Sequence, residues 1–410
     1  MPPRAAWLEV ILWAGYLACS WTWCIGLFLP VLLVRDYGIM GWVVFTIPNV
    51  IGAAAMGWVL REGMSERIVR DHAQAIELFR LVTVVFQLWF LLAYLMPPMG
   101  NDAIILPAGG RLAIVGALLA GLVLGLRPGL GVVAWIFSIG CAAFAFSKGD
   151  LALPVASPEA SGLGLLWLAP VCAFGFALCP YLDPTFHQAR QATRGGTALA
   201  AFTVGFGVMF LAMIVLTLFY ADWARAMASN AGGIAASAAV FIAMHIGLQL
   251  SYTCTVHARA TPGHGTWSAS RIGFAMLLAG AAALATAYLP DHSGLQAREI
   301  VYRVFMSFYG LVFPAYVWIC MAPLTSGVGG NTAREASGAK SASSSFMGLP
   351  RRTLKLLCVT IGMALPFYWM GFIERQELWL APGLGIVLAG RLLVRGRSAA
   401  DGTGAADGAT

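Results

Sequence analysis

Residues 179–190 read CPYLDPTFHQAR and end an otherwise apolar run. Pro180 and Pro184 each remove a backbone donor and disfavour a helical conformation in the residue before them. Asp183 followed by Pro184 is a strong helix start, because the carboxylate accepts from free amides and proline suits the first helical position. The stretch predicts that one helix ends near Cys179 and that another begins at Asp183.

The composition of the whole chain identifies the solvent around this break. Of 410 residues, 60 % are apolar and 10 % are charged, and a soluble domain of that size cannot hide so much apolar surface from water. The sequence therefore predicts an all-α, polytopic membrane protein. Runs of roughly 17 to 25 apolar residues predict about twelve spans: 7–34, 39–60, 77–97, 112–127, 129–147, 162–182, 198–220, 235–257, 268–289, 300–323, 355–373 and 377–394.

The depth of the break has two readings. A broken helix is tolerated inside a bilayer only where the freed backbone groups face protein, water or a ligand. Asp183, His187, Arg190 and Arg194 follow helical spacing and form one polar stripe, which a short amphipathic helix at the membrane surface also shows. Both readings stay open at this stage.

Basic residues predict the orientation of the chain. If the N-terminus is cytoplasmic, all but seven of the 25 Lys and Arg residues fall on the inner side. The positive-inside rule then places both termini in the cytoplasm of a multi-pass cell (inner) membrane protein. The net charge of +7 is a topology signal, and we expect no nucleic-acid partner because the charges are spread over many loops. The seven exceptions are Arg35, Arg111, Lys148, Arg225, Arg298, Arg303 and Arg375.

Two polar segments divide the predicted spans into groups of five, five and two. Five spans leave the second group inverted relative to the first, so we expect an inverted repeat. The eight cysteines lack CxxC spacing and are expected to be packing residues. The expected units are a first repeat (1–147), an extracytoplasmic connector (148–161), a second repeat (162–324), a flexible linker (325–349), two C-terminal helices (350–397) and a disordered tail (398–410).

The first span carries an interruption of its own. Residues 13–34 read WAGYLACSWTWCIGLFLPVLLV, within a run too long for a simple crossing. In transporters with inverted repeats, the binding site lies near the midplane, where corresponding helices of the two halves are broken. We therefore expect a solute site between the two breaks, with aromatic walls suited to an ammonium group or a sugar ring. Its candidate residues are Ser20, Trp21, Trp23, Gly26, Tyr181 and Phe186.

The eighth span adds polar residues to this region. His245, Gln249 and Tyr252 fall on one face of a helix, and buried polar groups in a bilayer usually face the bundle interior. We count them among the candidate solute-binding residues. His245 is either a satisfied interior histidine or a titrating group on a proton or substrate path.

The interrupted first span, the following segment GWVVFTIPNVIGAAAMGWVL (Gly41–Leu60) and the interrupted sixth span resemble the LeuT-fold transporters of the APC superfamily, with sodium:solute symporters nearest. The resemblance covers the ten-span core. It implies a sodium ion held by hydroxyls of the eighth span and carbonyls of the first break. The candidates are Ser251, Thr253 and Thr255 by hydroxyl, and Ala18 and Trp21 by backbone carbonyl. These hydroxyls can equally bond back to their own helix or link neighbouring helices.

Taken together, these features predict a symporter-like secondary active transporter that moves a small polar organic solute by alternating access. Coupling to Na⁺, or to H⁺, is expected, with Asp183 and His187 as gating or coupling residues and no organic cofactor. We expect no enzyme activity. A membrane-embedded enzyme remains an alternative, because Asp183, His187, His245 and His257 could form a metal or acid/base site. A channel and a sensor are further alternatives.

Overall fold

The computed structural model describes residues 3–95, 108–148, 153, 162–220, 236–259, 261–321 and 351–403, and the described parts are all-α. Short 3₁₀ and π-helical turns, labelled η, continue several helices. The principal elements are α1 (Pro3–Trp21), α2 (Cys24–Tyr37), α3 (Ile39–Val59), α4 (Met64–Asp71), α5 (Ala73–Phe90), η1 (Leu91–Leu95), α6 (Ala108–Leu124), α7 (Gly131–Ser147), α8 (Gly164–Leu178), η3 (Cys179–Leu182), α9 (Pro184–Ala192), α10 (Gly195–Val204), η4 (Gly205–Phe210), α11 (Leu211–Val215), α13 (Ala236–Ala258), α14 (Ala269–Tyr288), α15 (Ala297–Ser307), η6 (Phe308–Val312), α16 (Phe313–Tyr316), η7 (Val317–Met321), α17 (Arg351–Phe372) and α18 (Leu380–Thr403).

The chain is a multi-pass membrane protein by helix length and hydropathy. Among the described residues, nine helices are long and apolar enough to cross a bilayer, and the bent pair α1–α2 makes a tenth. The sequence predicted about twelve. The difference lies in α6, which is apolar but has 17 residues, and in α18, which does not join the nine.

The first span is broken as predicted. α1 and α2 meet at 60° across Thr22 and Trp23, and Trp23 is extended, with φ −86° and ψ 178°. Side chains replace the lost backbone bonds: Thr22 Oγ1 donates to the Ala18 carbonyl at 2.7 Å, and Trp23 Nε1 donates to the Ser20 carbonyl at 2.5 Å. The freed Cys24 amide donates to the Gln87 side chain at 3.0 Å. The break is thus stable inside the bundle, because few of its polar groups lack a partner.

The sixth span is broken at the predicted residues. α8 gives way to the single turn η3 over Cys179–Leu182, and α9 begins at Pro184. Asp183 is the N-cap: its Oδ1 accepts from the Thr185 amide at 2.7 Å and from the Thr185 hydroxyl at 2.6 Å. Asp183 and His187 are fully buried, and Arg190 nearly so. The turn therefore packs inside the protein, and the three polar side chains Asp183, His187 and Arg190 are buried rather than exposed on a helix surface.

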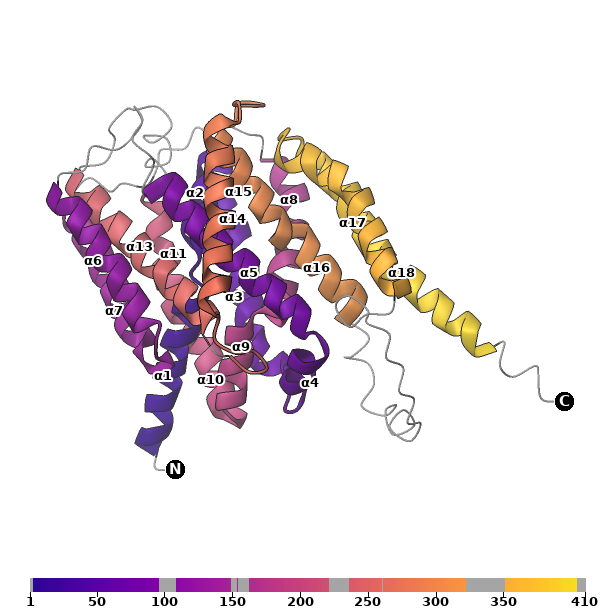
Figure 1. Cartoon of the computed structure of the whole chain (residues 1–410), viewed down its shortest axis with the longest axis horizontal. Coiled ribbons are helices and arrows are strands. Elements are labelled where there is room, and N and C mark those ends of the chain that lie inside the picture. The colour runs from indigo at the N-terminus through magenta and orange to yellow at the C-terminus, as the bar shows by residue number, and fades with distance from the viewer. Residues whose placement is uncertain are drawn as a thin grey trace.

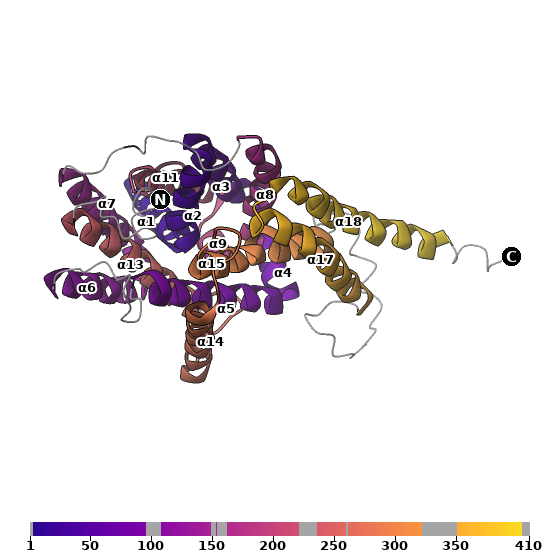
Figure 2. The same ribbon diagram turned by 90° about the horizontal axis from the view of Figure 1, so that it is seen from above.

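Figure 1 shows how the broken spans lie in the bundle. The N-terminus, α4, α9 and α10 lie at one end, which we call the N-terminal face. The end of α2, the start of α15 and the turn between α17 and α18 lie at the other end, which we call the opposite face. Both views place α17 and α18 to one side of the remaining helices (Figures 1 and 2).

Some of the predicted divisions fall outside the described residues. The linker 325–349 lies outside them entirely, as does nearly all of the connector 148–161. The tail predicted to be disordered from residue 398 is helical up to Thr403, because α18 continues through it.

Candidate functional site

The two breaks contact each other in the middle of the bundle. Ser20 Oγ donates to Thr185 Oγ1 at 3.1 Å, joining α1 to α9. The ring of Trp21 packs edge-on against Phe186, with centroids 4.9 Å apart, and its Nε1 donates to Asn49 Oδ1 of α3 at 2.7 Å. All of these side chains are buried. Residues far apart in the sequence therefore form one continuous polar and aromatic junction.

A small cavity lies beside this junction. It has ≈ 290 Å³ of space not filled by atoms. Of the predicted solute-binding residues, Trp21, Trp23 and Gly26 line it. Tyr309 of η6 also lines it and shares a hydrogen bond of 2.9 Å with Thr83. The centre of a water molecule can occupy ≈ 20 Å³ of it, about enough for one water molecule, so in this conformation the cavity is closed around the centre. The remaining lining residues are Ile25, Asn49, Phe176 and Cys179.

Three other predicted residues of this group pack elsewhere. Ser20 is bonded within the junction, and Phe186 stacks on Phe206 of η4 with centroids 5.2 Å apart. The Tyr181 ring is half-buried, and its carbonyl accepts from His187. None of the three lines the cavity in this conformation, so the cavity wall comes mainly from the first break.

Asp183 has a second partner, His257, which the sequence grouped with it only in the enzyme alternative. Its Oδ1 lies 3.6 Å from Nε2 of His257 on α13, and both side chains are fully buried. The His257 ring also packs edge-on against Trp23, with centroids 5.8 Å apart. Among the described residues, Asp183 Oδ2 and His257 Nε2 have no hydrogen-bond partner. An acid and an imidazole therefore meet where both breaks approach α13.

His187 holds the sixth-span break to the N-terminal face. Its Nε2 lies 3.0 Å from the Tyr181 carbonyl, so this nitrogen carries a proton and donates. Its Nδ1 lies 3.0 Å from the Ser65 hydroxyl, which in turn accepts from Gln191 at 2.9 Å. Both ring nitrogens of neutral His187 are therefore hydrogen-bonded, and the side chain links η3, α9 and α4. We call this link, from the Tyr181 carbonyl through His187 to Ser65, the strap.

The predicted polar face of α13 is buried. Gln249 donates to Ser138 Oγ of α7 at 2.7 Å, whereas its Oε1, both nitrogens of His245 and the Tyr252 hydroxyl lack partners among the described residues. Buried polar atoms without a partner are costly and each calls for a reason. None of the three side chains lines the small cavity.

The five predicted sodium donors do not converge. Thr253 Oγ1 reaches the Cys19 carbonyl at 3.4 Å, beside the first break. Ser251 and Thr255 instead donate to carbonyls of their own helix at 2.9 Å, and they lie against α6, where Gly121 and Gly125 leave room for them. Helix spacing explains this, because residues two apart in a helix point in different directions.

The other two predicted sodium donors, the backbone carbonyls of Ala18 and Trp21, already accept hydrogen bonds. The Ala18 carbonyl accepts from both the amide and the hydroxyl of Thr22, at 3.1 and 2.7 Å, and the Trp21 carbonyl accepts from the Trp23 amide at 2.9 Å. The residues present therefore do not fit a sodium site in this conformation. Thr253 is the one predicted donor whose hydroxyl lies at the break.

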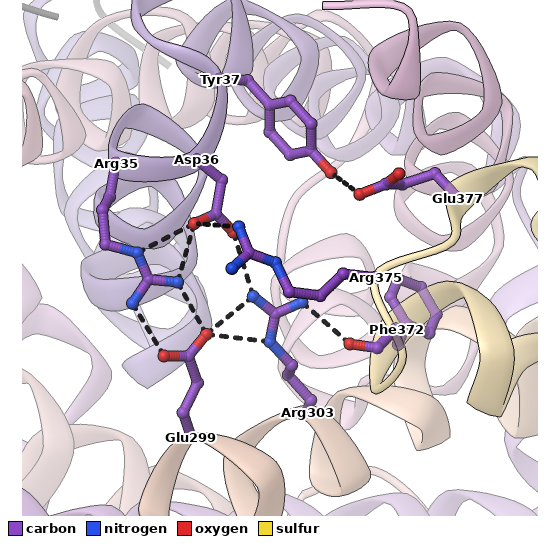
Figure 3. A network of polar contacts seen from close by, with 8 residues as sticks. All are labelled: Arg35, Asp36, Tyr37, Glu299, Arg303, Phe372, Arg375 and Glu377. Atoms are coloured by element: carbon purple, nitrogen blue, oxygen red, sulfur yellow. Dashed lines mark hydrogen bonds and ion pairs between the residues drawn. The ribbon is translucent and has the colours of Figure 1, made fainter. Parts of the chain in front are cut away.

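An ion-pair cluster closes the opposite face (Figure 3). Glu299 of α15 binds Arg35 of α2 at 2.7 and 2.8 Å through both carboxylate oxygens, and it also binds Arg303 at 2.7 Å. Asp36 lies 3.0 Å from Arg303 and 3.4 Å from Arg375. The cluster is partly buried, so it ties α2, α15 and the segment after α17 together more firmly than an exposed ion pair would.

A larger cavity lies directly below this cluster. It has ≈ 770 Å³ of unfilled space, with Asp36, Arg303 and Glu377 among its lining residues and mostly apolar side chains elsewhere. Phe176 and Tyr309 line this outer cavity and the small central one alike. These two rings therefore stand between the opposite face and the junction of the breaks.

A polar cavity lies at the N-terminal face. It has ≈ 560 Å³ of unfilled space. Ser65, the partner of His187, belongs to its wall, so the strap described above separates this cavity from the sixth-span break. The lining residues are Arg61, Glu62, Ser65, Glu66, Arg190, Gln191, Thr193 and Arg194.

Several of these residues were missed from the sequence. Asn49, Gln87 and Glu299 are polar residues within apolar spans, a signal that marks functional positions in membranes. Reading every such residue, rather than those near the breaks, would have found them. Their partners could not be found this way, because the contacts join distant helices.

The described residues contain no set of metal ligands of the kind that the enzyme alternative would use. No group of three or more His, Cys, Asp and Glu residues there could hold a metal ion. His245 and His187 do not join the contact between Asp183 and His257. That contact is the acid/base pair that the described residues bring together in the core.

Comparison with protein-family models, curated proteins and solved structures gave no match for this chain. Its function must therefore be inferred from the geometry of the site.

Proposed function

We propose that this protein is a secondary active transporter that moves a small organic solute across the membrane by alternating access. The observation that carries the proposal is the contact of two broken spans beside a cavity deep in the bundle. Broken helices at membrane depth expose backbone and side-chain groups to a ligand, and they supply points at which a bundle can flex.

The arrangement of the cavities supports this proposal. The outer cavity, the aromatic pair Phe176 and Tyr309, the central cavity and the polar cavity at the N-terminal face lie along the two breaks. The ion cluster closes one end, and the strap formed by Ser65 and His187 closes the other. We interpret the structure as an occluded state, in which neither end opens to the centre.

The helix contacts also support an inverted repeat of the LeuT type. α3 packs on α8 through Gly52, where a Cβ atom would lie 2.6 Å from the Phe176 carbonyl. In the same way, the span of α10 and η4 packs on α1 through Gly205, where a Cβ atom would lie 3.0 Å from the Ala14 carbonyl. In an inverted repeat, a two-fold axis relates the first span to the sixth and the second span to the seventh. It therefore maps the contact between α3 and α8 onto the contact that α10 and η4 make with α1.

The lining of the central cavity suggests the kind of solute. Trp21, Trp23 and Tyr309 present aromatic surfaces, and Asn49 is the polar side chain among them. Aromatic faces favour a cation or a flat ring, and a single amide fixes its orientation. We propose a small solute with an ammonium group or a ring, taken up together with Na⁺ or H⁺.

Alternating access can be tested without knowing the solute. Cys172 lines the outer cavity, and Ser65→Cys places a second thiol in the polar cavity at the N-terminal face. Each is labelled in membranes with a small polar maleimide, in a background where the other native cysteines are replaced. Because Ser65→Cys also removes the hydroxyl bonded to His187, every rate at position 65 is compared with that of the Ser65→Cys protein itself. Glu299→Gln breaks the outer ion pair with Arg35, so we expect labelling of Cys172 to accelerate and labelling at position 65 to slow.

A matched control removes the same charge on the same face. Glu374 is bonded to His292 and Ser293 and lies outside the cluster. We expect Glu374→Gln to leave both labelling rates unchanged. Acceleration at both thiols in Glu299→Gln would indicate a continuous pore or general loosening and would contradict alternating access.

A further inference from the structure

The hydrogen bonds of His257 fix where its proton lies. Its Nδ1 is 3.0 Å from the Thr253 carbonyl, four residues earlier on α13. A carbonyl only accepts, so Nδ1 must carry a hydrogen. In a neutral imidazole, Nε2 is then a bare lone pair, and it faces Asp183 Oδ1 at 3.6 Å.

This arrangement is unfavourable unless one more proton is present. Without it, a lone pair faces a carboxylate, and two polar atoms, His257 Nε2 and Asp183 Oδ2, stay buried without partners. Uncompensated charge in such a buried site is strongly destabilising. One added proton removes the conflict between Nε2 and Oδ1, either on Nε2, giving an imidazolium beside the carboxylate, or on Oδ1, giving an acid that can donate to Nε2.

We infer that Asp183 and His257 form a proton-binding site that holds one shared proton in the occluded state. Asp183 Oδ1 and His257 Nε2 are 3.6 Å apart, which is within ion-pair distance but longer than a hydrogen bond. A small movement of α9 relative to α13 therefore strengthens or breaks the contact. The proton thereby favours the conformation in which the sixth-span break is held against α13.

The site is also connected to the first break. Ser20 donates to Thr185, and the Thr185 hydroxyl donates to Asp183 Oδ1 at 2.6 Å, so a chain of hydrogen bonds runs from α1 to the carboxylate. On the other side, the His257 ring contacts Trp23. Loss of the proton therefore acts on both breaks at once. Assigning the proton as the coupling ion rests on the proposed transport function, whereas its binding at the pair does not.

Other titratable or charged groups lie around the pair. Arg80 of α5 donates its Nε to the His257 carbonyl at 2.7 Å and is paired with Glu77 at 2.7 Å, so its charge is already compensated. His187 is satisfied in its neutral form. The further groups that interact electrostatically with Asp183 from neighbouring elements are Tyr16 of α1, Cys179 of η3 and Tyr309 of η6. None of them is bonded to Asp183 Oδ2 or His257 Nε2.

Nitrogen NMR of histidine-labelled protein in micelles tests proton binding directly. The chain has six histidines, and His257→Gln identifies the signals of His257 by their loss. At neutral pH, we expect either two protonated ring nitrogens or an Nε2 shifted by accepting a proton from Asp183. Raising the pH should move this signal to that of a bare Nε2. An unshifted, bare Nε2 in the parent at neutral pH would overturn the site.

Asp183→Asn is the matched variant. Asn caps a helix about as well as Asp, so α9 should keep its start while the negative charge beside His257 is lost. We expect a folded protein whose His257 signal no longer changes with pH. An unchanged titration of His257 in this variant would contradict a proton shared with Asp183.

A second measurement, cysteine labelling, tests whether the proton bound at this pair is also the coupling ion. Labelling of Cys172 and of Ser65→Cys is repeated across the pH range of the NMR transition. If the proton is the coupling ion, the two rates change in opposite directions in the parent and stay constant with Asp183→Asn. A titrating pair with labelling that does not depend on pH would refute the coupling role alone, and absence of reciprocal labelling under every condition would refute transport itself.

Discussion

Ser20 and Thr185 lie 165 residues apart in the sequence, yet their hydroxyl oxygens are 3.1 Å apart at the junction of the two broken spans. Each belongs to a helix that stops inside the bundle. Their hydrogen bond therefore joins two segments whose relative position depends on side-chain contacts rather than on a continuous backbone.

Removing this bond should weaken the junction measurably. A buried hydrogen bond contributes about 1 kcal/mol, so we expect Ser20→Ala to lower the free energy of unfolding by about that amount. Thr185→Val should cost more, because the Thr185 hydroxyl also donates to Asp183. Thermal unfolding in detergent measures both. Ser147→Ala is the control, since that exposed hydroxyl bonds only to its own helix, and equal losses in Ser20→Ala and Ser147→Ala would contradict a specific junction.

Sodium should not stabilise this conformation specifically. Of the three predicted hydroxyl donors, only Thr253 reaches the first break, and both lone pairs of the Ala18 carbonyl are taken by Thr22. We expect equal unfolding temperatures in sodium and in potassium at the same ionic strength. A sodium-specific rise that persists in Ser251→Ala but is lost in Thr253→Val would instead assign the coupling ion as Na⁺.

The pH dependence of stability should include a contribution from His72, between α4 and α5. Burial lowers the pKa of His72 below its ordinary 6.5, and its Nδ1 lies 2.9 Å from the Tyr316 hydroxyl. The unfolded chain takes up this proton more readily than the folded one. The stabilising contribution is therefore complete above about pH 6.5 and is lost as the pH falls toward the lowered pKa.

The measurement compares parent and His72→Gln between about pH 7.5 and about pH 5.5, which brackets the ordinary pKa of histidine. The fall in unfolding temperature on acidification should be smaller in the variant. His292→Gln, at an exposed histidine on the opposite face, serves as the control. If acidification lowers the unfolding temperature of His72→Gln and parent equally, His72 does not contribute.

The breaks were predictable because their causes are local. Pro180, Pro184 and the Asp183 cap act on their own backbone, so residues 179–190 alone indicate where one helix stops and the next begins. For the first span, the sequence predicted that the helix is interrupted but not how the groups at the break would be bonded. That Thr22 and Trp23 would satisfy the freed carbonyls of their own turn was not deduced from the sequence.

The partners across the bundle were not predictable in this way. Helical spacing placed His245, Gln249 and Tyr252 on one face of α13, and the enzyme alternative grouped His257 with Asp183. The sequence could not indicate that His257 is the histidine of that group that meets Asp183. That contact depends on how α13 lies against the sixth-span break. The sodium donors were taken from the family resemblance, which could not indicate that Ser251 and Thr255 face α6 in this structure.

Two glycines of η4 test the packing on which the proposed repeat depends. A Cβ atom at Gly205 would lie 3.0 Å from the Ala14 carbonyl and 3.4 Å from Leu17, whereas one at Gly207 meets nothing within 4 Å. Overpacking a close helix contact costs about 1–3 kcal/mol, and replacing glycine by alanine in an open helix position gains about 0.5–1 kcal/mol.

We therefore expect Gly205→Ala to lower the unfolding temperature and Gly207→Ala to keep or raise it. Gly52→Ala should behave like Gly205→Ala, because its added Cβ would lie 2.6 Å from the Phe176 carbonyl in the contact that the proposed two-fold relates to this one. The measurement is the thermal unfolding temperature of the three variants relative to the parent. If Gly52→Ala were neutral while Gly205→Ala destabilised the protein, the two contacts would not be equivalent, and the inverted repeat would lose its main structural support.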